Sequence, residues 1–306
     1  MVPAVLTLLS ALILDRLVGD PHTPFHPVAL FGRFVGWWGR PGRYPLSLQR
    51  VAGVVLWTFS VFLFALPFWV AENYLPSLVL LLVSPFLLKV TFAWRSLEEH
   101  AAAVEVALSS GGLEEGRQAA GMLVSRDTAA LSAEEIRSAA YESVAENLSD
   151  SVVAPLFWFL LFAPLGFGLT AAAVYRAVNC MDAMLGYPDE RVRLGWWAAR
   201  ADDLANLVPS RLTALVGLLY FGVKGRFIPA WQTLRADRRE RPGPNGGWPM
   251  GVIAGGTGVK FVKPGVYTIG PGDRRLVDGG QDIIRAVRGI TLGFCSFGII
   301  ALFLLG

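Results

Sequence analysis

The side chains of this sequence that could do chemistry gather in three blocks between Tyr141 and Asn206. On a helix that turns about 100° per residue, Glu142, Glu146 and Asp150 of the first block lie on one face. The other two blocks repeat this helical spacing with Arg176, Asn179, Asp182, Arg200, Asp202, Asp203 and Asn206. All three blocks border apolar segments, where charge is costly and is usually kept for function. The alternative interpretation is a set of solvated helix faces.

The composition is that of an integral membrane protein. The 306 residues are 54% hydrophobic and 17% charged, with a mean hydropathy of +0.49, whereas soluble proteins carry about 25% charged residues. A net charge of only +3 does not suggest a nucleic-acid partner. Cys180 and Cys295 form no disulfide framework or zinc pattern, and His22, His26 and His100 are too scattered for a histidine-rich metal site.

Apolar stretches predict an all-α polytopic membrane protein with about 4–6 membrane segments. Val51–Ala71 and Pro76–Trp94 are predicted to form a helical hairpin around the turn Glu72–Leu75, with Lys89 snorkelling toward the interface. Ala286–Leu305 is the last predicted span. The N-terminal stretch Val2–Leu14 is short for a span, so we expect it to extend to Gly19 or to be half-inserted.

Two further apolar stretches are interrupted. Val152–Ala173 contains Pro164–Gly168 and is either one span or two half-helices, and Leu204–Val223 contains Pro209 and Arg211. The positive-inside rule puts Arg40–Arg50 and Lys224–Arg288 in the cytoplasm. The two interrupted segments must then both cross or both fold back. Folding back at least partly is preferred, because it leaves the polar clusters on one side.

A polar connector joins the first two apolar stretches. Its three prolines are incompatible with a regular helix. Asp15, Asp20, His26 and Arg33 are candidate site residues there, unless the prolines simply set turns.

The whole chain, 1–306, is interpreted as one membrane enzyme domain with two polar regions. Residues 95–150 are predicted to be a soluble insert of two or three amphipathic helices, broken at Gly111-Gly112 and Ser125–Thr128, with a capping box from Ser132 to Glu135. Residues 224–285 form a Gly/Pro-rich region of short β-like pieces. Its run Gly255–Gly258, followed by Lys260 and Lys263, either contacts phosphate or only makes turns. It is not a Walker A motif.

Four runs in this order resemble the CobD/CbiB family of cobalamin-biosynthesis membrane proteins. The runs are L-D-R-L-V-G-D-P…H-P-V…G-R, E-S-V-A-E-N-L-S-D, Y-R-A-V-N-C-M-D-A-M-L-G-Y and A-R-A-D-D-L-A-N-L-V-P-S-R-L-T. The resemblance extends from about Leu12 to Gly270. Cys180 stands where the family pattern leads us to expect Thr, and Ser210 where we expect Ala; neither change touches a charged position.

The resemblance implies an adenosylcobinamide-phosphate synthase. Such an enzyme joins adenosylcobyric acid to (R)-1-amino-2-propanol or its O-phosphate, with ATP consumed through an acyl phosphate. It is expected in the cell (inner) membrane with its active site facing the cytoplasm. The resemblance also allows two further kinds of partner, other cobalamin-pathway enzymes and a second copy of the chain.

The chemistry that the resemblance implies gives candidate roles to the polar residues described above. The implied metal set for Mg²⁺ is Glu142, Glu146, Asp150, Asp202 and Asp203. Cations on the transferring phosphoryl group would be Arg176, Arg200 or Arg211, and the base for the attacking ammonium would be His26, Asp15 or Asp182. The remaining catalytic candidates are Asn147 and Asn179, and the remaining substrate-binding candidates are Asp20, Arg33, Asn206, Lys260 and Lys263.

Two rival functions stay open at this point. A transporter or permease for corrinoids would also place polar residues at broken membrane helices, but inverted repeats are not visible in the sequence. A scaffold of the cobalamin assembly complex would leave the dense acid and arginine clusters unexplained.

Overall fold

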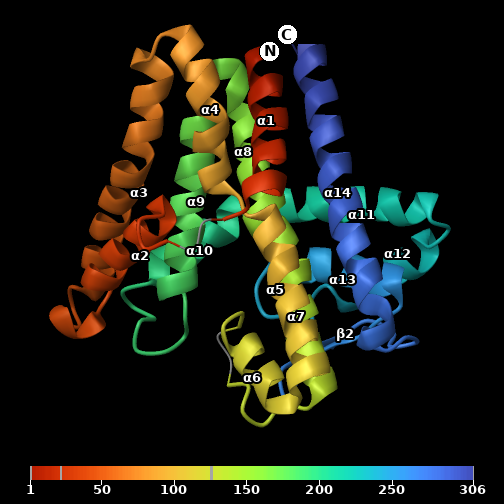
Figure 1. Cartoon of the computed structure of the whole chain (residues 1–306). Helices are drawn as coiled ribbons and strands as arrows, with labels where there is room; N and C mark the ends of the chain where they lie inside the picture. The colour runs from red at the N-terminus through yellow and green to blue at the C-terminus, as the bar shows by residue number, and fades with distance from the viewer. Residues whose placement is uncertain (1, 21–22, 125–126, 306) are drawn as a thin grey trace. The chain divides into compact units, whose positions relative to one another are not determined.

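The computed structural model describes residues 2–20, 23–124 and 127–305, and most of this part is helical (Figure 1). His22, and the residues Ser125 and Arg126 of the predicted break, lie outside the described residues. The chain divides into two compact units, and each unit is described separately. The first contains Met1–Ala93, Ala154–Asn206 and Gly298–Gly306; the second contains Trp94–Val153 and Leu207–Phe297.

Four helices of the described chain are long and apolar enough to cross a membrane. They are Gln49–Tyr74, Ser77–Gly111, Ala133–Leu165 and Leu276–Leu304. The bent pair Trp196–Ala205 and Leu207–Val223 raises the number to five if it counts as one span. The prediction of an all-α polytopic membrane protein is therefore confirmed.

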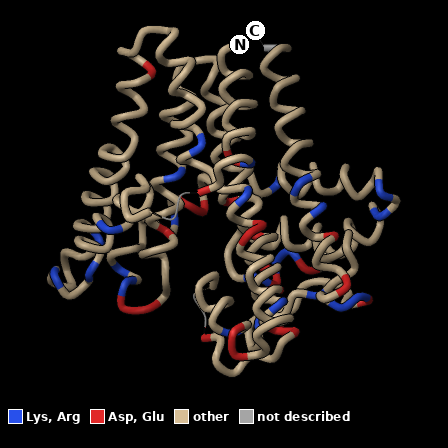
Figure 2. Tube along the Cα trace, in the orientation of Figure 1, with Lys and Arg blue, Asp and Glu red and all other residues tan. Residues whose placement is uncertain are grey.

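The first unit is built of helices α1–α4 and α8–α10. Their bounds are α1 Val2–Val18, α2 Pro27–Trp38, the short η1 Pro41–Arg43, α3 Gln49–Tyr74, α4 Ser77–Thr91, α8 Ala154–Phe162, the short η4 Ala163–Leu165, α9 Gly168–Leu185 and α10 Trp196–Ala205. Figure 2 shows long stretches of α3, α4 and α8 without a charged residue. The hairpin α3–α4 confirms the prediction, although its turn is shorter than expected because α3 continues to Tyr74. Likewise α1 extends past Asp15, as expected.

The interrupted segment Val152–Ala173 is two helices. After η4 the chain turns at Gly166, whose φ of 79° is favourable only for glycine, and α9 packs back against α8. Glu72 of α3 caps the start of α9. Its carboxylate accepts hydrogen bonds from the backbone N–H groups of Leu169 at 2.6 Å and Thr170 at 3.0 Å. An anion at a helix N-terminus stabilises the helix, so Glu72 fixes the helix that carries Arg176 and Asn179.

The second unit contains the insert and the C-terminal part of the chain. Its elements are α5 Trp94–Val106, the π-helical turn η2 Ala107–Gly111, α6 Leu113–Gly121, α7 Ala133–Asn147, the π-helical turn η3 Leu148–Val153, α11 Leu207–Val223, α12 Phe227–Asp237, α13 Gly247–Thr257, β1 Phe261–Lys263, β2 Tyr267–Ile269 and α14 Leu276–Leu305, of which the last residues belong to the first unit. The insert has three helices, α5, α6 and α7, where two or three were predicted. The capping box between Ser132 and Glu135 is present at the start of α7.

The glycine-rich stretch differs from its prediction. Only β1 and β2 are strands, paired antiparallel from Phe261 opposite Ile269, while Gly247–Thr257 forms the buried helix α13. Its glycines allow close packing: a Cβ on Gly255 would lie 2.5 Å from the Pro229 carbonyl oxygen, and one on Gly256 would lie 2.4 Å from the Phe221 ring. The run is therefore a packing surface within a helix, and the prediction of turns and short β-like pieces is wrong for it. Its contact with phosphate stays a prediction.

Candidate active site

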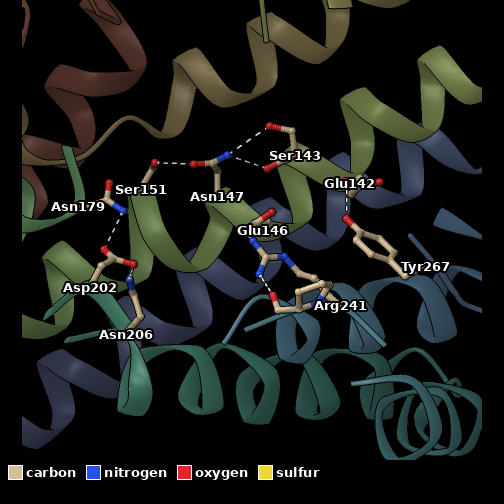
Figure 3. A network of polar contacts seen from close by, with 11 residues as sticks. Glu142, Ser143, Glu146, Asn147, Ser151, Asn179, Asp202, Asn206, Arg241 and Tyr267 are labelled. Carbon is tan, nitrogen blue, oxygen red and sulfur yellow. Dashed lines mark hydrogen bonds and ion pairs between the residues drawn. The ribbon is translucent and has the colours of Figure 1, made fainter. Parts of the chain in front are cut away.

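Helices α9 and α10 of the first unit hold a connected set of the predicted polar residues. Asn179 Nδ2 donates to Asp202 Oδ1 at 3.2 Å, and Asn206 Nδ2 donates to Asp202 Oδ2 at 3.0 Å (Figure 3). Tyr175 donates its hydroxyl proton to Asn206 Oδ1 at 2.8 Å. Asn206 is fully buried and Asp202 is 8% exposed. Both carboxylate oxygens of Asp202 are thus oriented by amides.

Arg176 belongs to the same side of α9. Its Nη1 lies 3.5 Å from Asn179 Oδ1, so the predicted three-residue spacing does bring these two side chains together. Its Nε is buried, and no hydrogen-bond acceptor for it is found among the described residues. Of the other predicted residues, Asp182 lies on α9 and Asp203 on α10, both half-buried, while Arg200 of α10 is exposed.

Lys89 does not snorkel to the interface as expected. It is buried, and its Nζ lies 2.5 Å from Asp20 Oδ1 and 3.2 Å from Asp15 Oδ1. The side chain of Asp15 is fully buried, and that of Asp20 is 22% exposed. A buried carboxylate needs a compensating partner, which explains why this lysine turns inward. Asp15 and Asp20, predicted to bind substrate, form an ion cluster with Lys89.

His26 is held in one orientation at the start of α2. Its Nδ1 accepts a hydrogen bond from the backbone N–H of Val28 at 3.3 Å. Burial lowers the pKa of His26; the positive charges of Lys89 and Arg176 lower it further, against the opposing effect of Asp20. A neutral imidazole that accepts at Nδ1 carries its proton on Nε2. This tautomer favours hydrogen-bond donation by His26 over the predicted role as a base.

Arg33, the remaining candidate of this connector, contacts the backbone of the same connector. Its Nη2 donates to the Pro24 carbonyl oxygen at 2.6 Å. The connector before α2 is therefore held by a side chain from α2 itself.

The acids of α7 in the second unit each have a partner from the C-terminal part of the chain. Glu146 forms an ion pair with Arg241, and the Tyr267 hydroxyl donates to Glu142 Oε1 at 2.5 Å (Figure 3). Asn147 lies beside them and accepts a hydrogen bond from Ser151 at 2.9 Å. Asp150 follows in the π-helical turn η3, and such turns inside helices frequently occur at functional sites.

Arg241 is the site residue that the sequence interpretation missed. Burial opposes its charge, but Glu146, Asp150 and Tyr267 together raise the pKa of Arg241. Burial, followed by the charge and hydrogen bond of Glu142, raises the pKa of Tyr267 well above its ordinary value, so the phenol stays protonated as a donor. The only sequence signal for Arg241 is its place in the basic run R-R-E-R before Pro242.

Arg211 of α11 holds the loop that carries Arg241. Its Nη1 donates to Asn245 Oδ1 at 2.6 Å and its Nη2 to the Pro244 carbonyl oxygen at 3.0 Å. Its guanidinium carbon also lies 4.8 Å from the centre of the Trp248 ring. These contacts give Arg211 a positioning role, and its predicted contact with a phosphoryl group remains a prediction.

Lys260 and Lys263 differ in their surroundings. Lys260 lines a cavity of about 310 Å³ together with Arg274, Arg275, Glu134 and Glu135. Lys263 is absent from that lining, and its Nζ lies 6.0 Å from the centre of the Tyr267 ring. Only Lys260 therefore has the setting of a phosphate-binding lysine.

The carboxylates of the described residues do not by themselves form a metal site. Among the described residues, no group of three or more His, Cys, Asp or Glu side chains is arranged to hold a metal ion, and Glu142 and Glu146 bond to Tyr267 and Arg241. Mg²⁺ is usually held by one or two carboxylates together with substrate phosphates. These residues therefore fit an ion that arrives with a nucleotide. Whether the acids of α7 meet Asp202, Asp203 and Arg176 stays a prediction, because the two sets belong to different units.

The fold and these polar clusters define a polytopic, almost entirely helical membrane protein with ionisable groups beside its spans. The sequence model of the family described as CobD/Cbib protein matches residues 8–290. The chain therefore belongs to the CobD/CbiB family.

Curated relatives cover most of this chain. A protein of Methanothermobacter thermautotrophicus named probable cobalamin biosynthesis protein CobD is 40% identical over 267 residues, 86% of each chain. One of Thermococcus kodakarensis with the same name is 40% identical over 99% of this chain and 96% of its own. The cobalamin biosynthesis protein CobD of Dehalococcoides mccartyi is 37% identical over 89% of this chain and 88% of its own. No solved structure matches the chain significantly.

Proposed function

We propose that this chain acts in cobalamin biosynthesis as an amide synthase. It joins the free carboxylate of adenosylcobyric acid to (R)-1-amino-2-propanol or its O-phosphate, with ATP consumed. Membership of the CobD/CbiB family and the names of the relatives support the pathway. The observation that carries the chemistry is the group Glu142, Glu146, Asp150 and Arg241, a set of acids with a half-buried cation on the border of a candidate span.

The reaction proceeds in two steps. An oxygen of the corrinoid carboxylate attacks the γ-phosphorus of ATP, so the bond to the β-phosphate oxygen breaks and ADP leaves. The amine nitrogen then attacks the acyl carbon of the resulting acyl phosphate, inorganic phosphate leaves, and the nitrogen loses its protons to a base. A free carboxylate does not condense with an amine at neutral pH, which is why ATP is needed.

The chain's residues have defined tasks in these steps. In the second unit, Arg241 is the cation for charge that develops on the transferring phosphoryl group. In the first unit, Arg176 and Arg200 remain the candidate cations. In the first unit, Asp182 remains the candidate base, and His26 donates a hydrogen bond from Nε2; Asp15 is fully buried beside Lys89. Glu146 and Asp150 would hold a Mg²⁺ that arrives with ATP, and this ion would supply charge neutralisation there. The site faces the cytoplasm across the cell (inner) membrane in this proposal, because the basic segments favour that side.

The test of this function is substrate-dependent ATP consumption by the purified protein in detergent. We expect ADP to appear only when the corrinoid acid and the aminopropanol (phosphate) are both present, together with one amide product per ADP. A corrinoid permease or an assembly scaffold, the two rival functions, would form no amide under these conditions. Corrinoid uptake into vesicles without any amide product would favour the permease.

Lys260 is expected to bind a phosphate of the nucleotide or of the amine substrate. Lys260→Ala should raise the KM of that substrate about threefold or more, because one charge-assisted hydrogen bond is lost. Lys263→Ala is the matched control: it removes a lysine nearby in the sequence that does not line the cavity, and it should leave both KM values unchanged. Unchanged KM values for Lys260→Ala as well would rule out phosphate binding at this cavity.

A further inference from the structure

Helix α11 of the second unit has one continuous apolar face that is exposed. Four residues on this face, Val208, Leu215, Leu219 and Val223, are between 48% and 89% exposed, and their spacing of seven or four places them on one side of the helix. The opposite face packs against α13 and η3. The charged residue of α11, Arg211, bonds to the loop before α13. An exposed apolar face of this length marks an interaction surface.

Helix α11 meets α14 of the same unit at a close crossing. Figure 1 shows α11 running across α14 and not alongside it. Two glycines of α14 form the contact. A Cβ on Gly289 would collide with the Tyr220 ring, and a Cβ on Gly293 would lie 3.1 Å from a methyl group of Val216. Small residues let two helices approach this closely. The two glycines are only about 6 Å apart along α14, so the contact fixes the level at which α11 crosses it.

This level is also where the charged part of α14 ends. The charged residues of α14 all precede Gly289, and no charged residue follows Arg288; Figure 2 shows the tan upper part of this helix. Helix α14 is a candidate span, and charge within hydrocarbon is costly. The lipid–water boundary of α14 therefore falls next to Gly289, and α11 crosses α14 at this boundary.

The segment after α11 has the composition of a membrane–water interface. Lys224 and Arg226 are exposed at the turn into α12, and Phe227, Ile228 and Trp231 are exposed on α12 itself. Tryptophan is enriched at membrane–water interfaces, and interfacial helices combine an apolar face with basic side chains that favour the headgroups. The surface is apolar along α11 and basic and aromatic at its end, which matches the boundary between acyl chains and headgroups.

We propose that α11 lies in the plane of the membrane and packs its apolar face on the acyl chains directly beneath the headgroups of a phospholipid bilayer. The segment Leu207–Val223 then neither crosses the membrane nor folds back through it. Arg211 holds the loop that carries Arg241, so this position places that loop next to the membrane surface. The inference does not depend on the proposed enzymatic function.

The experiment measures the depth of α11 by fluorescence quenching, with the full chain in phosphatidylcholine vesicles. Cys180 and Cys295, the two cysteines of the sequence, are replaced by alanine. Val208→Cys, Leu215→Cys and Val223→Cys then each carry a small fluorophore. The quencher is a nitroxide on a lipid acyl chain, either near the headgroup or near the methyl end. Because interfacial helices reach only about 5–10 Å into the bilayer, all three positions should be quenched about twofold more by the shallow nitroxide.

Leu63→Cys is the matched control. Leu63 is about midway along the candidate span Gln49–Tyr74 and is 43% exposed, so its fluorophore should be quenched more by the deep nitroxide. Thermal unfolding shows whether each labelled variant is folded. A variant that fails to fold is replaced by Leu219→Cys, which lies on the same face of α11 as the three tested positions.

Two results would overturn the proposal. The first is stronger quenching of Leu215→Cys by the deep nitroxide, with Val208→Cys and Val223→Cys reached by a water-soluble quencher from opposite sides of the vesicle. That result would make α11 a membrane span. The second is quenching of these positions by neither nitroxide, which would show that the apolar face is covered by protein or lies in water.

Discussion

Replacing Glu146 with glutamine should lower the turnover of amide formation at least about tenfold, equivalent to roughly 1.4 kcal/mol of transition-state stabilisation. The change keeps the size of the side chain but removes the charge that faces Arg241. Glutamine is also a weaker ligand for a Mg²⁺ bound with ATP, so the Mg²⁺ concentration needed for half-maximal turnover should rise. The measurement is amide formation at several Mg²⁺ concentrations, with thermal stability followed in parallel.

The chain offers a matched control for this variant. Glu105 of α5 forms an ion pair with Arg137 at 3.0 Å, and its side chain is 26% exposed compared with 24% for Glu146. Glu105→Gln therefore removes a similar ion pair from the same unit and should leave turnover unchanged. Wild-type turnover of Glu146→Gln with an unshifted Mg²⁺ requirement would mean that the acids of α7 have only a structural role.

A double variant separates the ion pair from the chemistry. Paired residues couple by about 0.5–3 kcal/mol, so adding Arg241→Gln to Glu146→Gln should recover stability that either single change loses. Turnover should stay low in the double variant, because both the acid and the cation of the site are missing. Recovery of stability and turnover together would show that the pair matters for folding alone.

Replacing Lys89 with methionine should destabilise the protein by about 3–5 kcal/mol, the range for breaking a buried ion pair from one side. Methionine keeps an unbranched apolar side chain of similar length, so the loss is mainly that of the ammonium group between Asp15 and Asp20. The carboxylate of Asp15 is fully buried and would lose this positive partner. The measurement is the free energy of unfolding in mixed detergent micelles.

Lys224→Met provides the control for Lys89→Met. Lys224 is exposed after the end of α11, and its replacement should change the free energy of unfolding by less than about 0.5 kcal/mol. Adding Asp20→Asn to Lys89→Met should recover part of the lost stability, because one of the two uncompensated carboxylates becomes neutral. If Lys89→Met is as stable as Lys224→Met, Lys89 does not compensate Asp15 and Asp20. That result would favour the original prediction that the Lys89 side chain extends to the membrane interface.

Some of this structure was predictable because its causes are local. An apolar stretch as long as Gln49–Tyr74 must be a membrane helix, since only a helix satisfies its own backbone in hydrocarbon. The capping box from Ser132 to Glu135 involves residues three positions apart, and the spacing of Arg176 and Asn179 is a property of one helix. Such features depend on composition or on neighbours within about one turn, and the sequence displays both directly.

Other features depend on which distant segments pack together. Glycines are poor helix formers, so the sequence of Gly247–Thr257 predicted turns and short strands. The segment is instead a buried helix, and its glycines pack closely against Pro229 and Phe221. Likewise Lys89 forms ion pairs with Asp15 and Asp20, and Glu146 forms an ion pair with Arg241. No short-range pattern encodes these pairs, because a buried charge requires a partner but does not specify where in the sequence it lies. The sequence alone determined the membrane helices and the family, and the tertiary structure decided which acids Lys89 and Arg241 compensate.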